Sequence, residues 1–182
     1  MFIQTENTPN PATIKFLPGK TVMETGTADF QSAEKAGNSP LAQRLFMLPG
    51  VASVFLGRDF ISVSKKEETE WAALKSRVLS AIMDHYFSGE PAIIKTTETT
   101  NAEPRDEVTQ RIIDLIDERI RPAVAQDGGD IVFEAFEDGI VYLEMRGACA
   151  GCPSSTMTLK AGIENMLKHY VPEVKEVRPV VL

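Results

Sequence analysis

Hydrophobic residues recur at strand or helix spacing in two separate stretches of this 182-residue chain. At the start, residues 2–6 and 13–16 predict two short strands, because the segment between them holds two prolines and two asparagines that are typical of a turn. Ser39 followed by Pro40 predicts the start of a short helix, whose leucines repeat along one side until a Pro-Gly pair stops it.

The rest of the first stretch predicts a hairpin and a long helix. Residues 51–56 and 60–63 are strand-like and flank a short connection that contains glycine. Residues 71–87 carry apolar side chains near helical spacing. The first domain, residues 1–87, is therefore expected to fold in the order ββαββα.

The second stretch begins with a helix and a hairpin. From about Arg105, apolar residues lie on one side of a helix and charged residues on the other, until Pro122 perturbs its last turn. A β-hairpin follows, because Ile131, Phe133 and Ala135 alternate before an Asp-Gly turn and three further apolar residues alternate after it.

A second helix is predicted over residues 153–169, and valines near the C-terminus predict a last strand. The second domain, residues 105–182, is thus expected to fold as αββαβ, a small sheet backed by helices. Residues 88–104 are rich in Gly, Pro, Thr and Glu and are expected to form a flexible linker. The predicted fold class is α+β with two small domains.

Charge and hydropathy exclude several classes of partner. Basic and acidic residues balance up to residue 87, so the net charge of −7 falls on the rest of the chain. This argues against a nucleic-acid partner, because phosphate binding needs clustered Lys and Arg. No apolar run approaches the roughly 20 residues that cross a bilayer, so no membrane partner is expected.

The first residues show neither a signal peptide nor a transit segment. We therefore expect a bacterial cytoplasm, with the mitochondrial matrix as the alternative.

No catalytic arrangement is evident, so we do not expect an enzyme. Neither a glycine-rich phosphate loop nor a Ser-His-Asp spacing is present. His85 and His169 are expected to cap helices or to lie at the surface rather than to bind metal, and the Asp127 and Asp130 pair is expected to mark a tight turn.

Large apolar side chains in the predicted helices are expected to pack into the cores. Trp71, Tyr86 and Phe87 belong to this group in the first domain, and Met157 and Met166 belong to it in the second.

The only two cysteines, Cys149 and Cys152, lie between the predicted hairpin and the second helix. Their neighbours are small, and Gly151 permits backbone angles that let both thiols point the same way. Pro153 suits the first position of a helix, so Cys152 should lie at or next to its N-cap. Because a helix N-terminus carries partial positive charge, a lowered thiol pKa is expected.

This cysteine pair is compatible with three chemistries. A 4Fe-4S cluster takes four thiolates, which two copies of the chain would supply in a two-fold dimer. Zinc could be bound in the same way. A dithiol oxidoreductase would use one cysteine to attack a disulfide and the other to resolve it, although no thioredoxin-like order of elements precedes the pair. The residues alone leave these interpretations open.

Two segments of the second domain resemble the C-terminal domain of the NifU family, the Nfu-type iron-sulfur scaffolds. They are IRPAVAQDGGDI at residues 120–131 and RGACAGCPSSTMTLKAGIE at residues 146–164. The segments FIQTENTPNPATIKFLPG, SPLAQRLFMLPGV and FLGRDFISV are similar to the N-terminal domain that accompanies it. The resemblance implies a homodimeric carrier that holds a 4Fe-4S cluster between Cys149 and Cys152 of two copies. It also implies upstream assembly machinery and apo iron-sulfur client proteins as partners.

Overall fold

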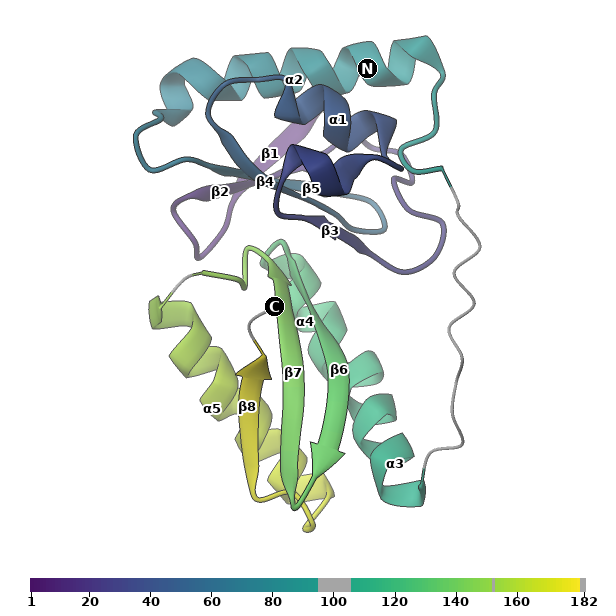
Figure 1. Cartoon of the computed structure of the whole chain (residues 1–182), viewed down its shortest axis with the longest axis vertical. Coiled ribbons are helices and arrows are strands. Elements are labelled where there is room, and N and C mark those ends of the chain that lie inside the picture. The colour runs from purple at the N-terminus through teal and green to yellow at the C-terminus, as the bar shows by residue number, and fades with distance from the viewer. Residues whose placement is uncertain (95–105, 152, 181–182) are drawn as a thin grey trace. The chain divides into compact units, whose positions relative to one another are not determined.

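The computed structural model describes residues 1–94, 106–151 and 153–180. The chain forms two compact units, Met1–Thr97 and Glu98–Leu182, and each has its own sheet (Figure 1). Each unit also has its own hydrophobic core. This confirms the predicted α+β class with two domains.

Within residues 1–94, five strands form one antiparallel sheet. In spatial order they are β1 (Gln4–Asn7), β2 (Thr13–Leu17), β5 (Ile61–Lys65), β4 (Val51–Leu56) and β3 (Ala28–Phe30). The predicted hairpin joins β4 to β5, and the Gly57 N–H donates to the carbonyl of Phe60 across its turn (2.9 Å). Strand β3 is missing from the predicted order because three residues are too few to show an alternating pattern.

The helices of the first domain are α1 (Pro40–Phe46), α2 (Trp71–Ser88) and a short 3-10 helix, η1 (Ala33–Ala36). Helix α1 begins as predicted, since the Ser39 hydroxyl accepts a hydrogen bond from the Ala42 N–H (3.1 Å). Helices α1 and α2 cover the same face of the sheet (Figure 1).

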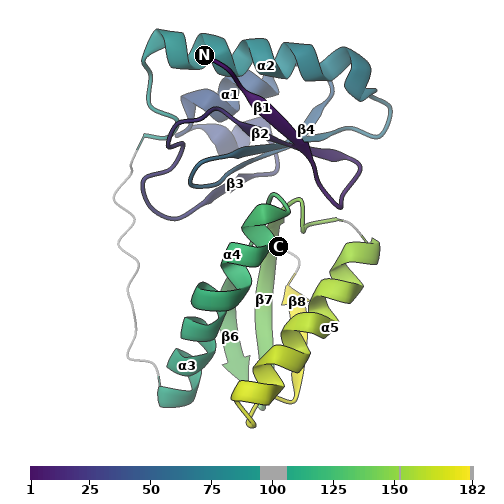
Figure 2. The same ribbon diagram turned by 180° about the vertical axis from the view of Figure 1, so that it is seen from behind.

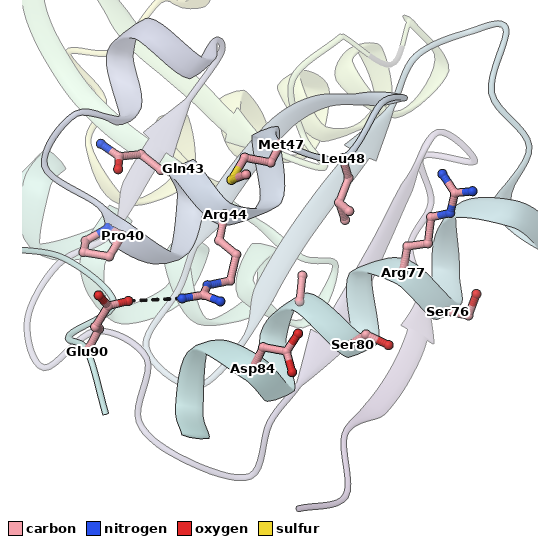
Figure 3. Close-up of a pocket in the computed structure, with 11 residues that line it drawn as sticks. Pro40, Gln43, Arg44, Met47, Leu48, Ser76, Arg77, Ser80, Asp84 and Glu90 are labelled. Carbon is pink, nitrogen blue, oxygen red and sulfur yellow. Dashed lines mark hydrogen bonds and ion pairs between the residues drawn. The ribbon is translucent and has the colours of Figure 1, made fainter. Parts of the chain in front are cut away.

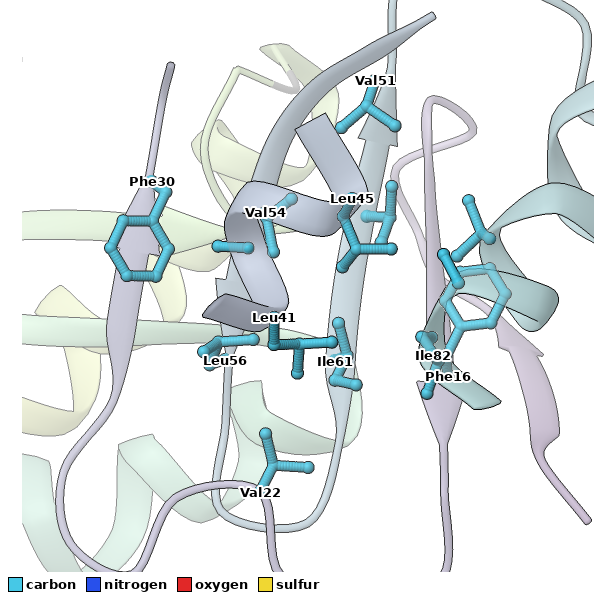
Figure 4. Close-up of a cluster of buried hydrophobic side chains, with 14 of the residues drawn as sticks. Phe16, Val22, Phe30, Leu41, Leu45, Val51, Val54, Leu56, Ile61 and Ile82 are labelled. Carbon is cyan, nitrogen blue, oxygen red and sulfur yellow. The ribbon is translucent and has the colours of Figure 1, made fainter. Parts of the chain in front are cut away.

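The core of the first domain lies between these helices and the sheet (Figure 4). Leu41 and Leu45 of α1 and Ile82 of α2 meet strand residues such as Phe16 and Ile61, and all five side chains are buried. Burying each contributes roughly 1.5–3 kcal/mol to stability, so the apolar spacing of the helices determines how they dock.

The chain after α2 stays attached to the first domain, and the predicted linker therefore begins too early at residue 88. The Ser39 hydroxyl donates to the carbonyl of Ala92 (2.6 Å), and the Ile94 N–H donates to the carbonyl of Asn38 (2.7 Å). Ala92 and Ile93 are partly buried against the core. The remaining predicted linker residues, 95–104, lie outside the described residues.

The second domain begins with one continuous helical segment made of α3 (Glu107–Leu115), the π-helical turn η2 (Ile116–Ile120) and α4 (Arg121–Gln126). In η2 the Arg121 N–H donates to the carbonyl of Ile116, five residues earlier. Pro122 has no N–H and clashes with a regular helical turn before it, so a local π-turn accommodates this proline. The predicted perturbation near Pro122 is thus present.

The predicted hairpin is formed by β6 (Gly129–Glu137) and β7 (Ile140–Gly147). Its turn places Asp138 and Gly139 at positive φ, as a two-residue hairpin of this type requires. The register shifts between Phe133 and Ala135, so Ala135 pairs with Tyr142 and Phe136 pairs with Val141. This bulge puts Phe136 rather than Ala135 against the core, contrary to the simple alternation of the sequence.

Helix α5 (Pro153–Tyr170) and strand β8 (Glu176–Val180) complete the domain, and β8 pairs with β7 in parallel. The α3–α4 segment and α5 cover the same face of the three-stranded sheet (Figure 2). Ile112, Ile163 and Leu143 are representative of the buried residues that the helices and the sheet contribute to this core.

Four expectations about single side chains turn out differently. Phe87 and Met157 are 78% and 76% exposed, because each lies on the outer side of its helix. His85 is fully buried rather than at the surface, on the inner side of α2. Asp130 lies buried at the start of β6 rather than in a simple turn. Trp71 and Tyr86 are partly buried against the first core.

Candidate metal centre

The two cysteines lie in the loop that joins β7 to α5. Strand β7 ends at Gly147 and α5 begins at Pro153, which agrees with the predicted position between a strand and a helix N-terminus. Cys149 belongs to the described residues, whereas Cys152 lies outside them.

Cys149 is 5% exposed and packs against the core of the second domain. Its Sγ lies directly over Gly129, the first residue of β6. A β-carbon at Gly129 would collide with this sulfur and would lie 2.8 Å from the Arg146 carbonyl oxygen and 3.0 Å from the Cys149 nitrogen. Only glycine leaves room for the Cys149 side chain here.

Backbone hydrogen bonds hold the loop in this position. The Ala148 N–H donates to the carbonyl of Gly128 (3.1 Å), and the Ala150 N–H donates to the carbonyl of Gly147 (3.1 Å). On the helix side, the Thr156 hydroxyl donates weakly to the Cys149 carbonyl (3.5 Å). The segment around Gly128 and the cysteine loop are thus joined next to the sulfur.

The protonation of Cys149 differs from the expectation based on the helix N-terminus. Burial, together with the smaller effect of the negative charges of Asp127 and Asp130, raises the pKa of the Cys149 thiol to about 12. The predicted lowering of the thiol pKa is therefore wrong for this cysteine in this arrangement. The expectation considered only the positive end of the helix dipole, whereas burial and two nearby carboxylates disfavour the thiolate.

Asp130 is tied to Arg121 next to this sulfur. The Arg121 guanidinium donates to both carboxylate oxygens of Asp130 at 2.8 Å, and the Ile131 N–H donates to one of them at 2.8 Å. The Asp130 side chain is 4% exposed and that of Arg121 is 33% exposed. A bidentate pair of this kind fixes the start of α4 against the start of β6.

Sequence reasoning missed Gly129, Asp130 and Arg121 as neighbours of the candidate site. A pair of glycines at the start of an alternating strand was the available signal, since glycine in a strand often marks a close approach.

No complete metal site is visible in the described part of the chain. Among the described residues, no three side chains of His, Cys, Asp or Glu are grouped so that they could hold a metal ion. A metal or cluster bound by thiolates would therefore need Cys149 together with further ligands that are not among the described residues.

The described residues contain no helix that is both long and apolar enough to cross a membrane.

A groove of about 760 Å³ lies between α1 and α2 in the first domain (Figure 3). The Arg44 guanidinium pairs with Glu90 on one side (3.3 Å), and Met47 and Leu48 provide apolar surface. Neither a cysteine nor a histidine lines this groove. It therefore offers no thiolate or imidazole ligand for a metal ion.

Both parts of the chain match known family models. Residues 3–89 match the model described as scaffold protein Nfu/NifU N terminal, and residues 112–178 match the NifU-like domain. The second match contains the β7–α5 loop and Cys149. The two domains therefore occur in the order that the resemblance implied.

Similar proteins match along almost the whole chain. NFU1 iron-sulfur cluster scaffold homolog, mitochondrial, from Homo sapiens is 51% identical over 99% of this chain and 72% of its own length. NifU-like protein 4, mitochondrial, from Arabidopsis thaliana is 50% identical over 97% of this chain. The chain spans 65% of that plant protein, slightly less than two thirds. These relatives are named as mitochondrial, so the prediction of a bacterial cytoplasm finds no support in them.

Among solved structures, a NifU-like protein from Saccharomyces cerevisiae is 26% identical over 53% of this chain and 87% of its own, with a TM-score of 0.48. The assignment rests instead on the full-length relatives and on the two matched domains. The chain belongs to the Nfu/NifU scaffold protein family.

Proposed function

We propose that this protein is an iron-sulfur cluster scaffold that carries a 4Fe-4S cluster and passes it to apo-proteins. The observation that carries the proposal is the position of Cys149, in a strand-to-helix loop of a NifU-like domain, within a chain about half identical to proteins named iron-sulfur cluster scaffolds. The cluster is the cargo of this protein rather than a resident catalytic group.

Cys149 and Cys152 are the proposed ligands. The chain has no other cysteine, and a cubane takes four thiolates, so a second copy would supply the remaining two. A two-fold axis through the cluster would bring together the same loop from each copy. In this proposal, residues 105–182 carry the cargo, and residues 1–87 serve recognition of partners. The names of the relatives favour a mitochondrial location.

A dithiol oxidoreductase is the competing function. It needs an accessible thiolate that attacks a disulfide. Cys149 is buried, and its thiol pKa is raised to about 12, so it is poorly suited to that attack. Zinc remains the competing cargo, since it accepts the same four thiolates.

Anaerobic reconstitution of the full chain with iron and sulfide tests the proposal. We expect about two irons and two sulfides per chain, visible absorption, and a shift to dimer on a sizing column, which follow from four thiolates per cubane. Cys149→Ala and Cys152→Ala should each abolish all three signals. Met47→Ala serves as a matched control, because Met47 is an exposed sulfur-containing residue of the first domain.

Transfer needs a separate measurement. The loaded chain should restore the activity of an apo-enzyme that depends on a 4Fe-4S cluster, and an iron chelator that blocks restoration by free iron and sulfide should leave this transfer intact. Stoichiometric zinc without sulfide would overturn the choice of cargo. A colourless monomer that reduces disulfides would instead establish the oxidoreductase.

A further inference from the structure

The closed position of Cys149 is difficult to reconcile with a cluster shared by two copies. A shared cluster requires the sulfur to reach the surface of the domain, whereas Cys149 is 5% exposed and belongs to the same buried cluster as Ile131 and Leu167. The thiol that is proposed to hold the cargo therefore has to leave its pocket before it can bind.

Gly129 creates that pocket. An added β-carbon there would overlap Sγ of Cys149 and crowd the Arg146 carbonyl oxygen at 2.8 Å. Two of the three nearest contacts are backbone atoms, which cannot rotate away as a flexible side chain would. The sulfur thus occupies the space that a side chain on β6 would otherwise fill, and steric exclusion makes this arrangement specific for glycine.

Two glycines flank the cysteine loop and allow its backbone to change conformation. Gly147 and Gly151 bracket Cys149 with φ of 63° and 74°, values that glycine adopts without strain. Between these glycines, the Ala148 N–H bond to the Gly128 carbonyl ties the loop to the segment before β6. Breaking this bond and lifting the sulfur away from Gly129 would open the loop while β6, β7 and α5 stay in place.

We propose that Gly129 holds Cys149 in a closed position in the unloaded chain, and that loading requires the loop between Gly147 and Gly151 to open. The inference rests on the proposed function for the meaning of the open state. Gly129 is a positioning residue in this scheme, since it acts on the cargo only through Cys149. The closed loop protects the thiol until a cluster is offered.

The test follows the reaction of Cys149 with iodoacetamide in the full, unloaded chain. Cys152→Ser leaves Cys149 as the only thiol. In this background, alkylation of the folded chain should be at least about 100-fold slower than in concentrated urea, because reaction must await local opening. Gly129→Ala should raise the rate in the folded chain by roughly tenfold or more, since the closed position is no longer available.

Gly162→Ala is the matched control. Gly162 lies in α5, and an added β-carbon there meets no atom within 4 Å, so the rate should not change. Circular dichroism establishes that each variant is folded. If Gly129→Ala does not fold, the ratio between the folded parent and urea still tests the closed position of Cys149, and a ratio below about 100-fold overturns the proposal. An unchanged rate in folded Gly129→Ala also overturns it.

This experiment uses no iron or sulfide, so its outcome is independent of whether the chain binds a cluster. Failure of reconstitution would refute the scaffold function while leaving the alkylation result in place. A normal cluster together with a freely reactive Cys149 would refute the closed position alone.

Discussion

At the scale of single residues, buried polar groups are the features with the largest expected effects. His85 is fully buried on α2, and among the described residues neither of its ring nitrogens has a hydrogen-bond partner. Burial and the positive charge of Arg44 lower the pKa of His85, while Glu90 opposes them. The folded first domain therefore holds this imidazole in its neutral form.

The stability of the first domain should consequently fall in acid. Because the folded pKa of His85 lies below its unfolded value of 6.5, the unfolded state binds the proton more readily, and stability is lost as the pH falls below that value. Urea unfolding from pH 7.5 to pH 5 measures this. His85→Leu should flatten the pH dependence, because it removes the buried group whose pKa is lowered. Equal slopes in the parent and His85→Leu would contradict the prediction.

The ion pair beside the cysteine loop should matter for the stability of the second domain. Arg121→Met leaves the buried Asp130 carboxylate without its bidentate partner, and we expect a loss of about 3 kcal/mol. Asp117→Asn removes only the exposed partner of the same arginine, with an expected loss of about 0.5 kcal/mol. Urea unfolding of both variants checks the difference. Equal losses would show that Asp130 does not depend on Arg121.

At the scale of elements, Ser39 joins two parts of the first domain. Its hydroxyl caps α1 by accepting from the Ala42 N–H and also donates to the Ala92 carbonyl. One buried side chain therefore fixes both the start of a helix and the chain that follows α2.

Ser39→Ala should cost about 1–3 kcal/mol, since both a cap and a buried hydrogen bond are lost. Hydrogen exchange at the Ile94 amide, which is bonded to the Asn38 carbonyl, should accelerate in this variant. Asp106→Ala provides the comparison, because Asp106 caps α3 at an exposed position in the second domain, and its loss should leave exchange at the Ile94 amide unchanged. Unchanged exchange at Ile94 would mean that Ser39 does not hold this segment.

At the scale of the whole molecule, the two domains have separate cores. The buried cluster of the first domain includes Leu74, that of the second includes Leu143, and the two clusters share no residue. A substitution that leaves a cavity in one core should therefore destabilise that domain and not the other.

Leu74→Ala and Leu143→Ala should each destabilise one domain by about 2–5 kcal/mol, since both leucines are buried and their removal leaves a cavity. Hydrogen exchange followed by mass spectrometry should show faster exchange within residues 1–94 for the first variant and within residues 106–180 for the second. Faster exchange throughout the chain in either variant would show that the domains unfold as one unit.

Local patterns in the sequence predicted most of the elements. Ser39 and Pro40 marked the start of α1, and the Asp-Gly turn marked the β6–β7 hairpin, because capping and turn formation depend on neighbouring residues. Strand β3 and the bulge after Phe133 were not predictable in this way. Their positions depend on pairing with strands elsewhere in the chain.

The sequence by itself determined the two-domain α+β organisation, the place of the cysteines between a strand and a helix, and the family, because these follow from spacing and residue identity. Only the tertiary structure decided that Cys149 lies buried over Gly129 with a raised thiol pKa. Burial and the charges of Asp127 and Asp130 depend on how β6 meets the cysteine loop, and these segments are brought together only by folding.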